Sequence, residues 1–192
     1  MSDWKQRLTT DLEPVLREAD PRARISAYHN MPYAIFHYPP EEEFPLRSEL
    51  ALLRTRLEQS GKRVTMISLA DCLADALAAE GLTTERIASA EKRIGTEKMI
   101  DTIHMVISRR RPLDDLVAAR IPEEADTASD IVFIVRAGSL FPFYRTSSLL
   151  EQLKGKLEVP AVLFYPGVLD GVAGLKFMGV LQAEQNYRPK IF

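Results

Sequence analysis

Hydrophobic residues recur every three or four positions in several stretches, which is typical of amphipathic helices. The clearest stripe consists of four leucines at helical spacing: Leu46, Leu50, Leu53 and Leu57. Gly61 follows it, where a helix C-cap is expected. A second stripe, spaced mostly by four, opens the chain: Trp4, Leu8, Leu12, Leu16 and Ala19. It predicts an N-terminal helix with a kink or second start at Pro14, ending at Asp20-Pro21.

The middle of the chain is also helical by pattern. A short helix is expected from Leu69 to about Gly81, followed by a long helical region that Thr83 or Thr84 caps and that reaches Arg110. Gly95-Thr96 is expected to split this region, since glycine weakens a helix and threonine can restart one. Its second part places four apolar residues on one face: Met99, Ile103, Val106 and Ile107. Two further short helices are expected around three apolar residues each: Leu113, Leu116 and Val117, then Leu149, Leu150 and Leu153.

Shorter β-prone runs alternate with these helices. We expect strands at residues 33–38, 63–69, 131–135 and 159–165, with Pro166-Gly167 turning the chain out of the last, and an edge strand at 175–181. The run at 131–135 is continuously apolar, which is typical of a central parallel strand buried on both faces.

This alternation predicts an α/β fold with a largely parallel sheet of about four to five strands and helices on both faces. It resembles a degenerate nucleotide-binding-type fold without a phosphate loop. We expect one α/β domain over residues 1–192, with a helical N-terminal segment at 1–30 and a linker-like acidic loop at 122–130. The pattern does not predict the strand order.

Composition narrows the class of protein. The chain has 192 residues, with 25 Lys or Arg against 27 Asp or Glu, which argues against a protein built to coat nucleic acid or an anionic membrane. Its single cysteine, Cys72, cannot form an internal disulfide, which fits a reducing compartment. The start of the chain lacks the pattern of a signal peptide, and no apolar run is long enough to span a bilayer. We therefore expect a cytoplasmic protein.

The loops that follow the strands lack familiar catalytic motifs. The loop after the first strand, HYPPEEEFPLR, carries two prolines and three carboxylates, and the RAGSLFPF loop has neither GxGxxG nor GK[ST]. Ser139 lacks the second glycine of a GxSxG elbow, and Asp71 beside Cys72 disfavours a thiolate. His29, His37 and His104 have no metal-ligand spacing. We expect no catalytic residue, no cofactor, no metal and no enzymatic activity.

The carboxyl ends of parallel strands meet at one edge of a sheet, where ligands bind. The expected strands bring seven side chains to this edge: His37, Tyr38, Ser68, Arg136, Ser139, Arg145 and Tyr165. The loop at 138–145 is aromatic, so Phe141 and Phe143 either form an interface with a partner or fold back into the core. Arg145 precedes a helix and needs an acidic partner, which is one of Glu41–Glu43, a ligand anion or another protein.

Two further segments carry unusual side chains. Arg109-Arg110-Arg111 ends a predicted helix, where positive charge is favoured, so helix capping explains it without nucleic acid. The C-terminal segment 186–192, with Tyr187 and Arg188, alternates aromatic, basic and apolar residues, so we expect it to pack on the domain or to dock with a partner.

Several segments together resemble a known family. They are SGKRVTMISLADCLADALAAEG, IVFIVRAGSLFPFYRTSSLLEQL, VPAVLFYPG with the following Asp170-Gly171, and the terminal NYRPKIF. In this order, over roughly residues 45–192, they resemble the BrxB family of the bacteriophage-exclusion (BREX) defence systems. The most distinctive parts are GSLFPFYR, the FYPG turn and the C-terminal segment.

The resemblance implies a small accessory protein of a multi-gene system that methylates host DNA and restricts phage. Such systems also contain a large AAA+ ATPase, a DNA methyltransferase and a PglZ-type protein of the alkaline-phosphatase superfamily. The family supplies no catalytic motif to carry over. Its shared positions here imply a common surface or structural core: Gly138, Ser139, Pro142, Arg145, Tyr165, Pro166 and Gly167.

Two hypotheses follow. In the first, the protein is an adaptor that binds the PglZ-type component, the ATPase or the methyltransferase. In the second, it is a nucleotide or small-ligand sensor, or an enzyme, with a site at the strand ends that uses His37, Ser139, Arg145 and Tyr165. Direct DNA binding ranks third because of the net negative charge. The candidate surface consists of eight residues: His37, Ser139, Phe143, Tyr144, Arg145, Tyr165, Tyr187 and Arg188.

Overall fold

The computed structural model describes residues 3–25, 32–171, 174–182 and 189–192. The α-helices are α1 (Asp3–Arg7), α2 (Glu13–Leu16), α3 (Arg22–Ile25), α4 (Glu43–Gln59), α5 (Leu69–Ala79), α6 (Thr84–Ile94), α7 (Thr96–Met105), α8 (Leu113–Ala118) and α9 (Thr146–Gln152). Two π-helical turns are η1 (Leu8–Leu12) and η3 (Val106–Arg110), and two 3₁₀ turns are η2 (Pro40–Glu42) and η4 (Ala137–Leu140). The strands are β1 (Tyr33–Tyr38), β2 (Arg63–Ser68), β3 (Asp130–Val135), β4 (Ala161–Asp170), β5 (Gly174–Phe177) and β6 (Lys190–Ile191).

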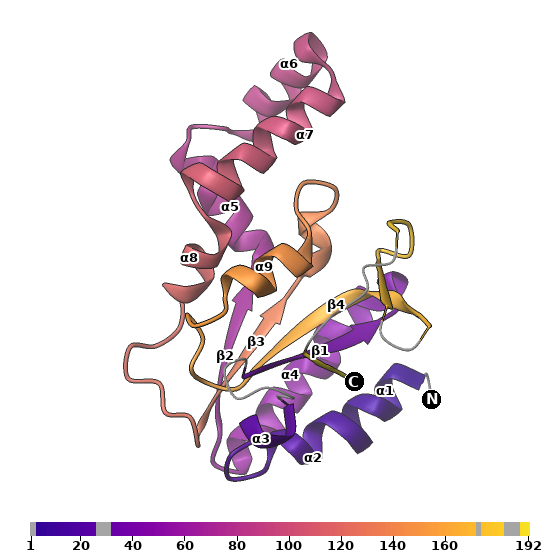
Figure 1. The fold of residues 1–192 in the computed structure, drawn as a ribbon, viewed down its shortest axis with the longest axis vertical. Coiled ribbons are helices and arrows are strands. Elements are labelled where there is room, and N and C mark those ends of the chain that lie inside the picture. The colour runs from indigo at the N-terminus through magenta and orange to yellow at the C-terminus, as the bar shows by residue number, and fades with distance from the viewer. Residues whose placement is uncertain (1–2, 26–31, 172–173, 183–188) are drawn as a thin grey trace.

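Five strands form the parallel part of the sheet, in the order β2-β3-β4-β1-β6 (Figure 1). The β3 strand lies between β2 and β4, and all six of its residues are buried, which confirms the prediction of a central strand. The largely parallel α/β sheet is also confirmed. The remaining strand, β5, pairs antiparallel with the second half of β4.

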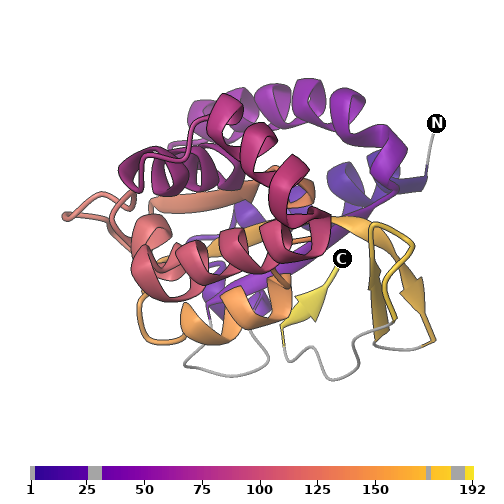
Figure 2. The ribbon, with the colours of Figure 1, turned by 90° about the horizontal axis from the view of Figure 1, so that it is seen from above.

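Helices cover both faces of the sheet, as predicted, because strand side chains alternate between two cores. In β1, Ile35 belongs to the core beneath α5, α8 and α9, which we call the first core. Its neighbour Phe36 belongs to the core beneath α4 and the N-terminal helices, which we call the second core. Figure 2 shows α4 and α9 on opposite sides of the strands. The leucine stripe of α4 is fully buried in the second core, so the spacing predicted both the helix and the side that it buries.

The N-terminal helix is continuous from Asp3 to Leu16 but changes geometry at η1, just before Pro14. Proline has no N–H to donate and therefore interrupts the regular helical ladder, as the sequence predicted. The predicted apolar stripe is buried from Trp4 to Leu16, whereas Ala19 lies beyond the helix and is exposed.

One prediction about β4 is wrong. Pro166-Gly167 does not turn the chain out of the strand, because β4 continues through it to Asp170. Up to Pro166, β4 pairs parallel with β1, and from Gly167 onward it pairs antiparallel with β5. Gly167 permits this change, since a Cβ there would overlap the backbone oxygen of Lys176 and the ring of Tyr165. The expected edge strand is correspondingly short, because β5 ends at Phe177 and turns follow.

The long helical region forms a projecting arm, which we define as α6 and α7 (Figure 1). The two helices separate at Gly95, and the Thr83 side chain accepts a hydrogen bond from the Arg86 backbone N–H, so both the split and the cap are confirmed. None of the α6 residues is buried. The apolar stripe of α7 and η3 leads from the arm into the first core, which Val106 and Ile107 join.

The end of the chain packs on the sheet. Strand β6 pairs parallel with β1, and the side chain of Phe192 is buried in the second core. Tyr187 and Arg188, which the sequence singled out, lie outside the described residues. In the part of the chain that is described, no helix has the length and apolar character needed to cross a membrane.

Candidate functional site

The carboxyl edge of the sheet gathers the strand ends as predicted, since β1, β2, β3 and β4 run parallel. The polar groups at this edge are held by internal contacts. The Ser68 hydroxyl accepts a hydrogen bond from the Asp71 N–H and caps α5, and the Tyr38 hydroxyl donates to Glu43. Burial and that carboxylate raise the pKa of Tyr38 well above its usual range.

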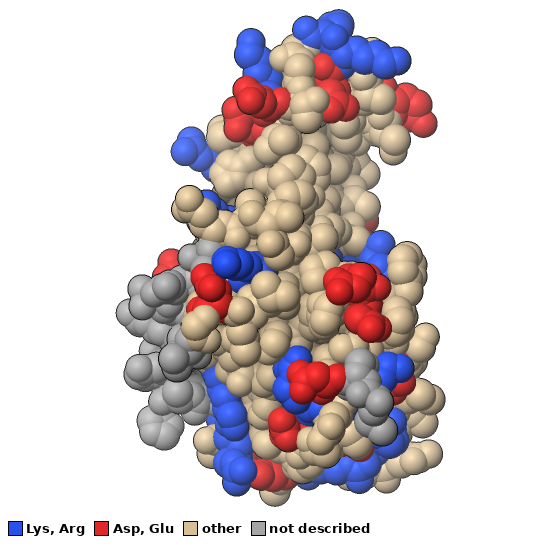
Figure 3. All heavy atoms as spheres, turned by 90° about the vertical axis from the view of Figure 1, so that its right-hand side faces the viewer, with Lys and Arg blue, Asp and Glu red and all other residues tan. Residues whose placement is uncertain are grey.

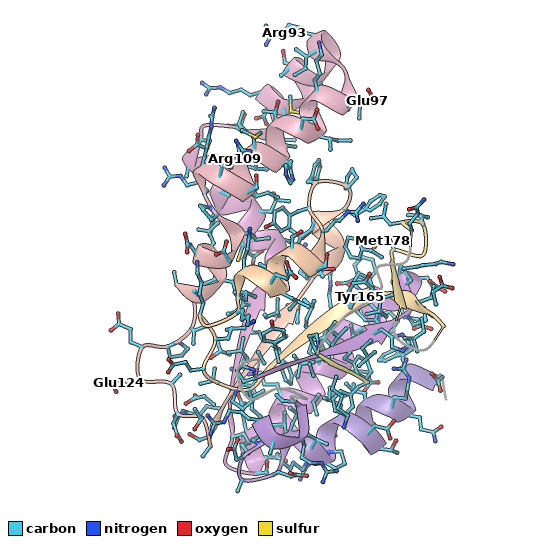
Figure 4. The ribbon with its side chains drawn as sticks, in the orientation of Figure 1. Arg93, Glu97, Arg109, Glu124, Tyr165 and Met178 are labelled. Atoms are coloured by element: carbon cyan, nitrogen blue, oxygen red, sulfur yellow. The ribbon has the colours of Figure 1, made fainter. Side chains whose placement is uncertain are left out.

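Tyr165 lies in the core and not on an accessible surface. Its side chain is fully buried, and its ring packs against Phe177 of β5 with centroids 5.3 Å apart. The Met178 N–H donates to the Pro166 carbonyl at 2.8 Å, which fixes the start of the turn after β5 over the end of β4. Figure 4 places Tyr165 beneath Met178 at this edge. The β4–β5 hairpin thus fills the place next to β4 where open α/β sheets bind ligands.

Ser139 is held in η4 by its own loop. Its hydroxyl donates to the Arg136 carbonyl at 2.8 Å, and Arg136 itself adopts a left-handed conformation with φ of 60°. The Arg136 guanidinium reaches Asp71 at 3.4 Å. Because the Ser139 hydroxyl proton is engaged with a carbonyl, the observed geometry gives this serine a structural role in shaping the loop.

The aromatic loop at 141–145 joins the body to the arm. Phe143 is partly buried against the first core, and its carbonyl accepts a hydrogen bond from His104 Nδ1 of α7 at 2.9 Å. Tyr144 is buried, stacks on the His104 ring and donates its hydroxyl to Gln152 at 2.6 Å. Burial raises the pKa of Tyr144. Of the two readings of this loop, folding back into the core describes Phe141, Phe143 and Tyr144 in the structure.

Arg145 lies immediately before α9, where its side chain is exposed but engaged in an interaction. Among its suggested acidic partners, Glu43 accepts hydrogen bonds from Arg47 and Tyr38.

Cys72 of α5 is buried, and burial raises the pKa of its thiol, as in an unreactive core cysteine.

His37 lines an open groove. The groove has a volume of about 610 Å³ and lies between the N-terminal helix, the β4–β5 hairpin and β6. Its polar lining includes five residues besides His37: Arg7, Asp11, Glu18, Arg24 and Lys190. Burial, together with the positive charge of Arg7, lowers the pKa of His37 to about 4, so the ring is neutral at physiological pH.

Arg7 is held in this groove by three contacts. Its guanidinium bonds Asp3 and the His37 carbonyl, and it lies 5.2 Å from the Phe36 ring. Sequence reasoning missed this groove because Arg7 and Lys190 stand at opposite ends of the chain, and only the pairing of β6 with β1 brings them together. Among the described residues, no group of three His, Cys, Asp or Glu side chains is placed to hold a metal ion.

Comparison with known proteins gives consistent matches. A family model described as "BREX protein BrxB" matches residues 65–191. A curated "BREX protein BrxB" from Bacillus cereus (strain H3081.97) is 25% identical over 180 residues, which cover 93% of this chain and 92% of that protein. No solved structure is significantly similar.

Proposed function

The chain belongs to the BrxB family of BREX proteins, and from this premise we propose that it acts as a non-catalytic adaptor in BREX phage defence. In this role it binds another component of the system, such as the PglZ-type phosphatase-superfamily protein, the AAA+ ATPase or the methyltransferase. It works in the cytoplasm by holding its partner rather than by transforming a substrate.

The observation that carries this proposal is the occupied carboxyl edge of the sheet. Parallel α/β sheets bind ligands outside the ends of their strands. Here the β4–β5 hairpin packs over that place through Tyr165 and Phe177, and the Ser139 and Tyr38 hydroxyls are bonded within the protein. The arm, by contrast, extends from the body with a helix that buries none of its residues, which supports contact with another molecule.

The test is affinity purification of the tagged chain from cells that express its native gene neighbours, at low and moderate salt. Nuclease treatment of the lysate removes bridging DNA, and mass spectrometry identifies what remains bound. A stoichiometric BREX protein that survives both salts and the nuclease is the expected result. A chain that purifies alone under every condition would overturn the adaptor role.

A second candidate, the binding of a nucleotide or another small ligand, is favoured by the groove at His37. Its volume of about 610 Å³ falls within the range of small-molecule pockets, and its lining has three positive charges, from Arg7, Arg24 and Lys190, against the two carboxylates of Asp11 and Glu18. A thermal-shift screen against nucleotides tests it, because a ligand at 100 times its Kd stabilises by about 2.7 kcal/mol. A shift that Arg7→Gln removes would support this candidate, and the absence of any shift would count against it.

A further inference from the structure

A hollow at the base of the arm is lined largely by apolar side chains and opens to the protein surface. It has a volume of about 250 Å³ and lies where the segment after α5 meets α7 and η3. Its apolar lining comes from Leu82, Met105 and Val106, with Thr102 beside them. Met105 is 41% exposed, a large fraction for a methionine next to the core residues Val106 and Ile107. The hollow is therefore large enough for one apolar side chain and is left open by the fold.

Positive charge exceeds negative charge at the mouth of this hollow. Arg110 and Arg111 share a single carboxylate, Glu80, at 3.3 and 3.2 Å. Arg109 stands next to them at the base of the arm (Figure 4), and within the described residues it has no ion-pair partner. Three consecutive arginines thus stand at this base beside one carboxylate that two of them already share, and Arg110 itself lines the hollow.

The other charged groups near the hollow do not remove this excess. Arg86 donates to the Gly81 carbonyl, and Asp101, next to Thr102 in the chain, makes no ion pair with any described residue. Residues 80–111, which include Glu80, carry seven Lys or Arg against five Asp or Glu, whereas the whole chain carries 25 against 27. Arg109, Arg110 and Arg111 therefore form a local basic cluster at the base of the arm, on a weakly acidic protein.

From the proposed adaptor role, we infer that this hollow is the docking site for an acidic protein segment with one apolar side chain. The apolar side chain enters between Leu82 and Met105, and carboxylates on either side of it pair with Arg109 and with the arginines that share Glu80. Aliphatic anchors in a pocket with arginines at the rim are typical of protein interfaces.

A protein segment fits this region better than nucleic acid does. Phosphates would pair with the arginines but would leave Met105 and the hollow unused. Figure 3 also shows Asp and Glu directly below the Lys and Arg at the outer end of the arm, so the arm is not a continuous basic track. A backbone that follows many phosphates needs such a track.

The first experiment places the photo-crosslinking residue p-benzoylphenylalanine at position 105, in cells that express the native gene neighbours. Position 52 is the matched control, because Leu52 is also an exposed apolar residue on a helix, at 55%, but lies on α4. Light is expected to join position 105 to a carboxylate-rich segment of another protein and to leave position 52 free of that product. A crosslink at 105 to DNA, or to a segment without carboxylates, would overturn the docking site.

The second experiment measures how much partner co-purifies with variants that place a negative charge at the base of the arm. Arg109→Glu and Met105→Glu are each expected to lower the bound partner about tenfold, as loss of an interface anchor does. Arg93→Glu is the matched control, because Arg93 is another arginine of the arm without an ion pair among the described residues, but lies at its tip (Figure 4). It should retain binding within about twofold.

These outcomes separate the docking site from the adaptor role. If the unaltered chain co-purifies a partner and both base variants still do, the hollow is not the docking site, whereas the adaptor role stands. If the unaltered chain binds no protein at all, the adaptor role itself fails. Circular dichroism and thermal unfolding of each variant confirm that a loss of binding is not a loss of folding.

Discussion

The carboxyl edge of the sheet and the arm show opposite uses of polar side chains. At the edge, Ser68, Ser139 and Tyr38 each bond a neighbouring group within the protein, and Tyr165 is covered by β5. On the arm, α6 buries none of its residues. The hydroxyls at the edge are thus bonded within the protein, and access there is through the groove at His37, whereas the arm is exposed along all of α6.

This difference shows that a polar side chain at the carboxyl edge of a parallel sheet does not by itself make a binding or catalytic site. Parallel strands did bring the expected side chains to one edge, but each hydroxyl had a structural use there. Accessible positive charge instead lies on a helical insertion between β2 and β3. A search for function in this fold therefore begins with the groups that folding leaves unpaired.

The largest expected effect is at the covered edge. Tyr165→Ala removes a fully buried ring from between β4 and β5 and should lower the free energy of unfolding by about 3–5 kcal/mol. Met105→Ala on the arm removes a side chain that is already partly exposed and should cost less than about 1 kcal/mol. Urea denaturation measures both. Equal losses would show that the arm is as tightly packed as the edge.

The pH dependence of stability tests His37, which lies at the same edge but lines the open groove. Burial and Arg7 lower its pKa to about 4 in the folded protein, against about 6.5 in the unfolded chain. The unfolded state therefore binds the proton more strongly than the folded state. The contribution of neutral His37 to the free energy of unfolding is complete above pH 6.5 and is lost as pH falls toward 4. The expected loss is about 2 kcal/mol, allowing for partial solvent access.

The control for this experiment is His37→Asn, which should flatten the difference in stability between pH 6.5 and 4.5. Nuclear magnetic resonance of the imidazole carbons follows the titration of the ring directly. A midpoint for His37 near 6.5 in the folded protein would contradict both the burial and the effect of Arg7.

Ser139→Ala has an intermediate effect and asks whether this serine has any use beyond its loop. Losing the hydrogen bond to the Arg136 carbonyl should cost about 1 kcal/mol. Partner co-purification should be unchanged, because the bond lies within η4 at the covered edge. Loss of partner binding without loss of stability would return Ser139 to the candidate surface.

Local pattern predicted the elements well because their causes are local. The spacing of Leu46, Leu50, Leu53 and Leu57 fixes one helical face, and Gly95 ends α6 with φ of 88°, a conformation that glycine adopts without strain. The continuation of β4 through Pro166-Gly167 could not be predicted, because this pair is typical of turns. Its extended form depends on β5, which pairs with it only in the folded molecule.

The candidate site was predicted less well, for a related reason. The sequence indicated which side chains reach the carboxyl edge but not which of them would be buried, since burial of Tyr165 depends on Phe177. Likewise, the run Arg109–Arg111 was explained by helix capping. Only the fold shows that Arg110 and Arg111 share Glu80 and that an apolar hollow lies beside them.

The smallest expected effect is at the tip of the arm. Lys92, Arg93 and Lys98 surround the turn at Gly95, are exposed, and make no ion pair with any described residue. Replacing all three with alanine should change the free energy of unfolding by no more than about 0.5 kcal/mol, because exposed charges without partners contribute little to folding. Thermal unfolding at low and moderate salt measures this. A larger loss that salt suppresses would mean that the tip charges interact with the body, and the arm would then be less independent of the sheet than its exposure indicates.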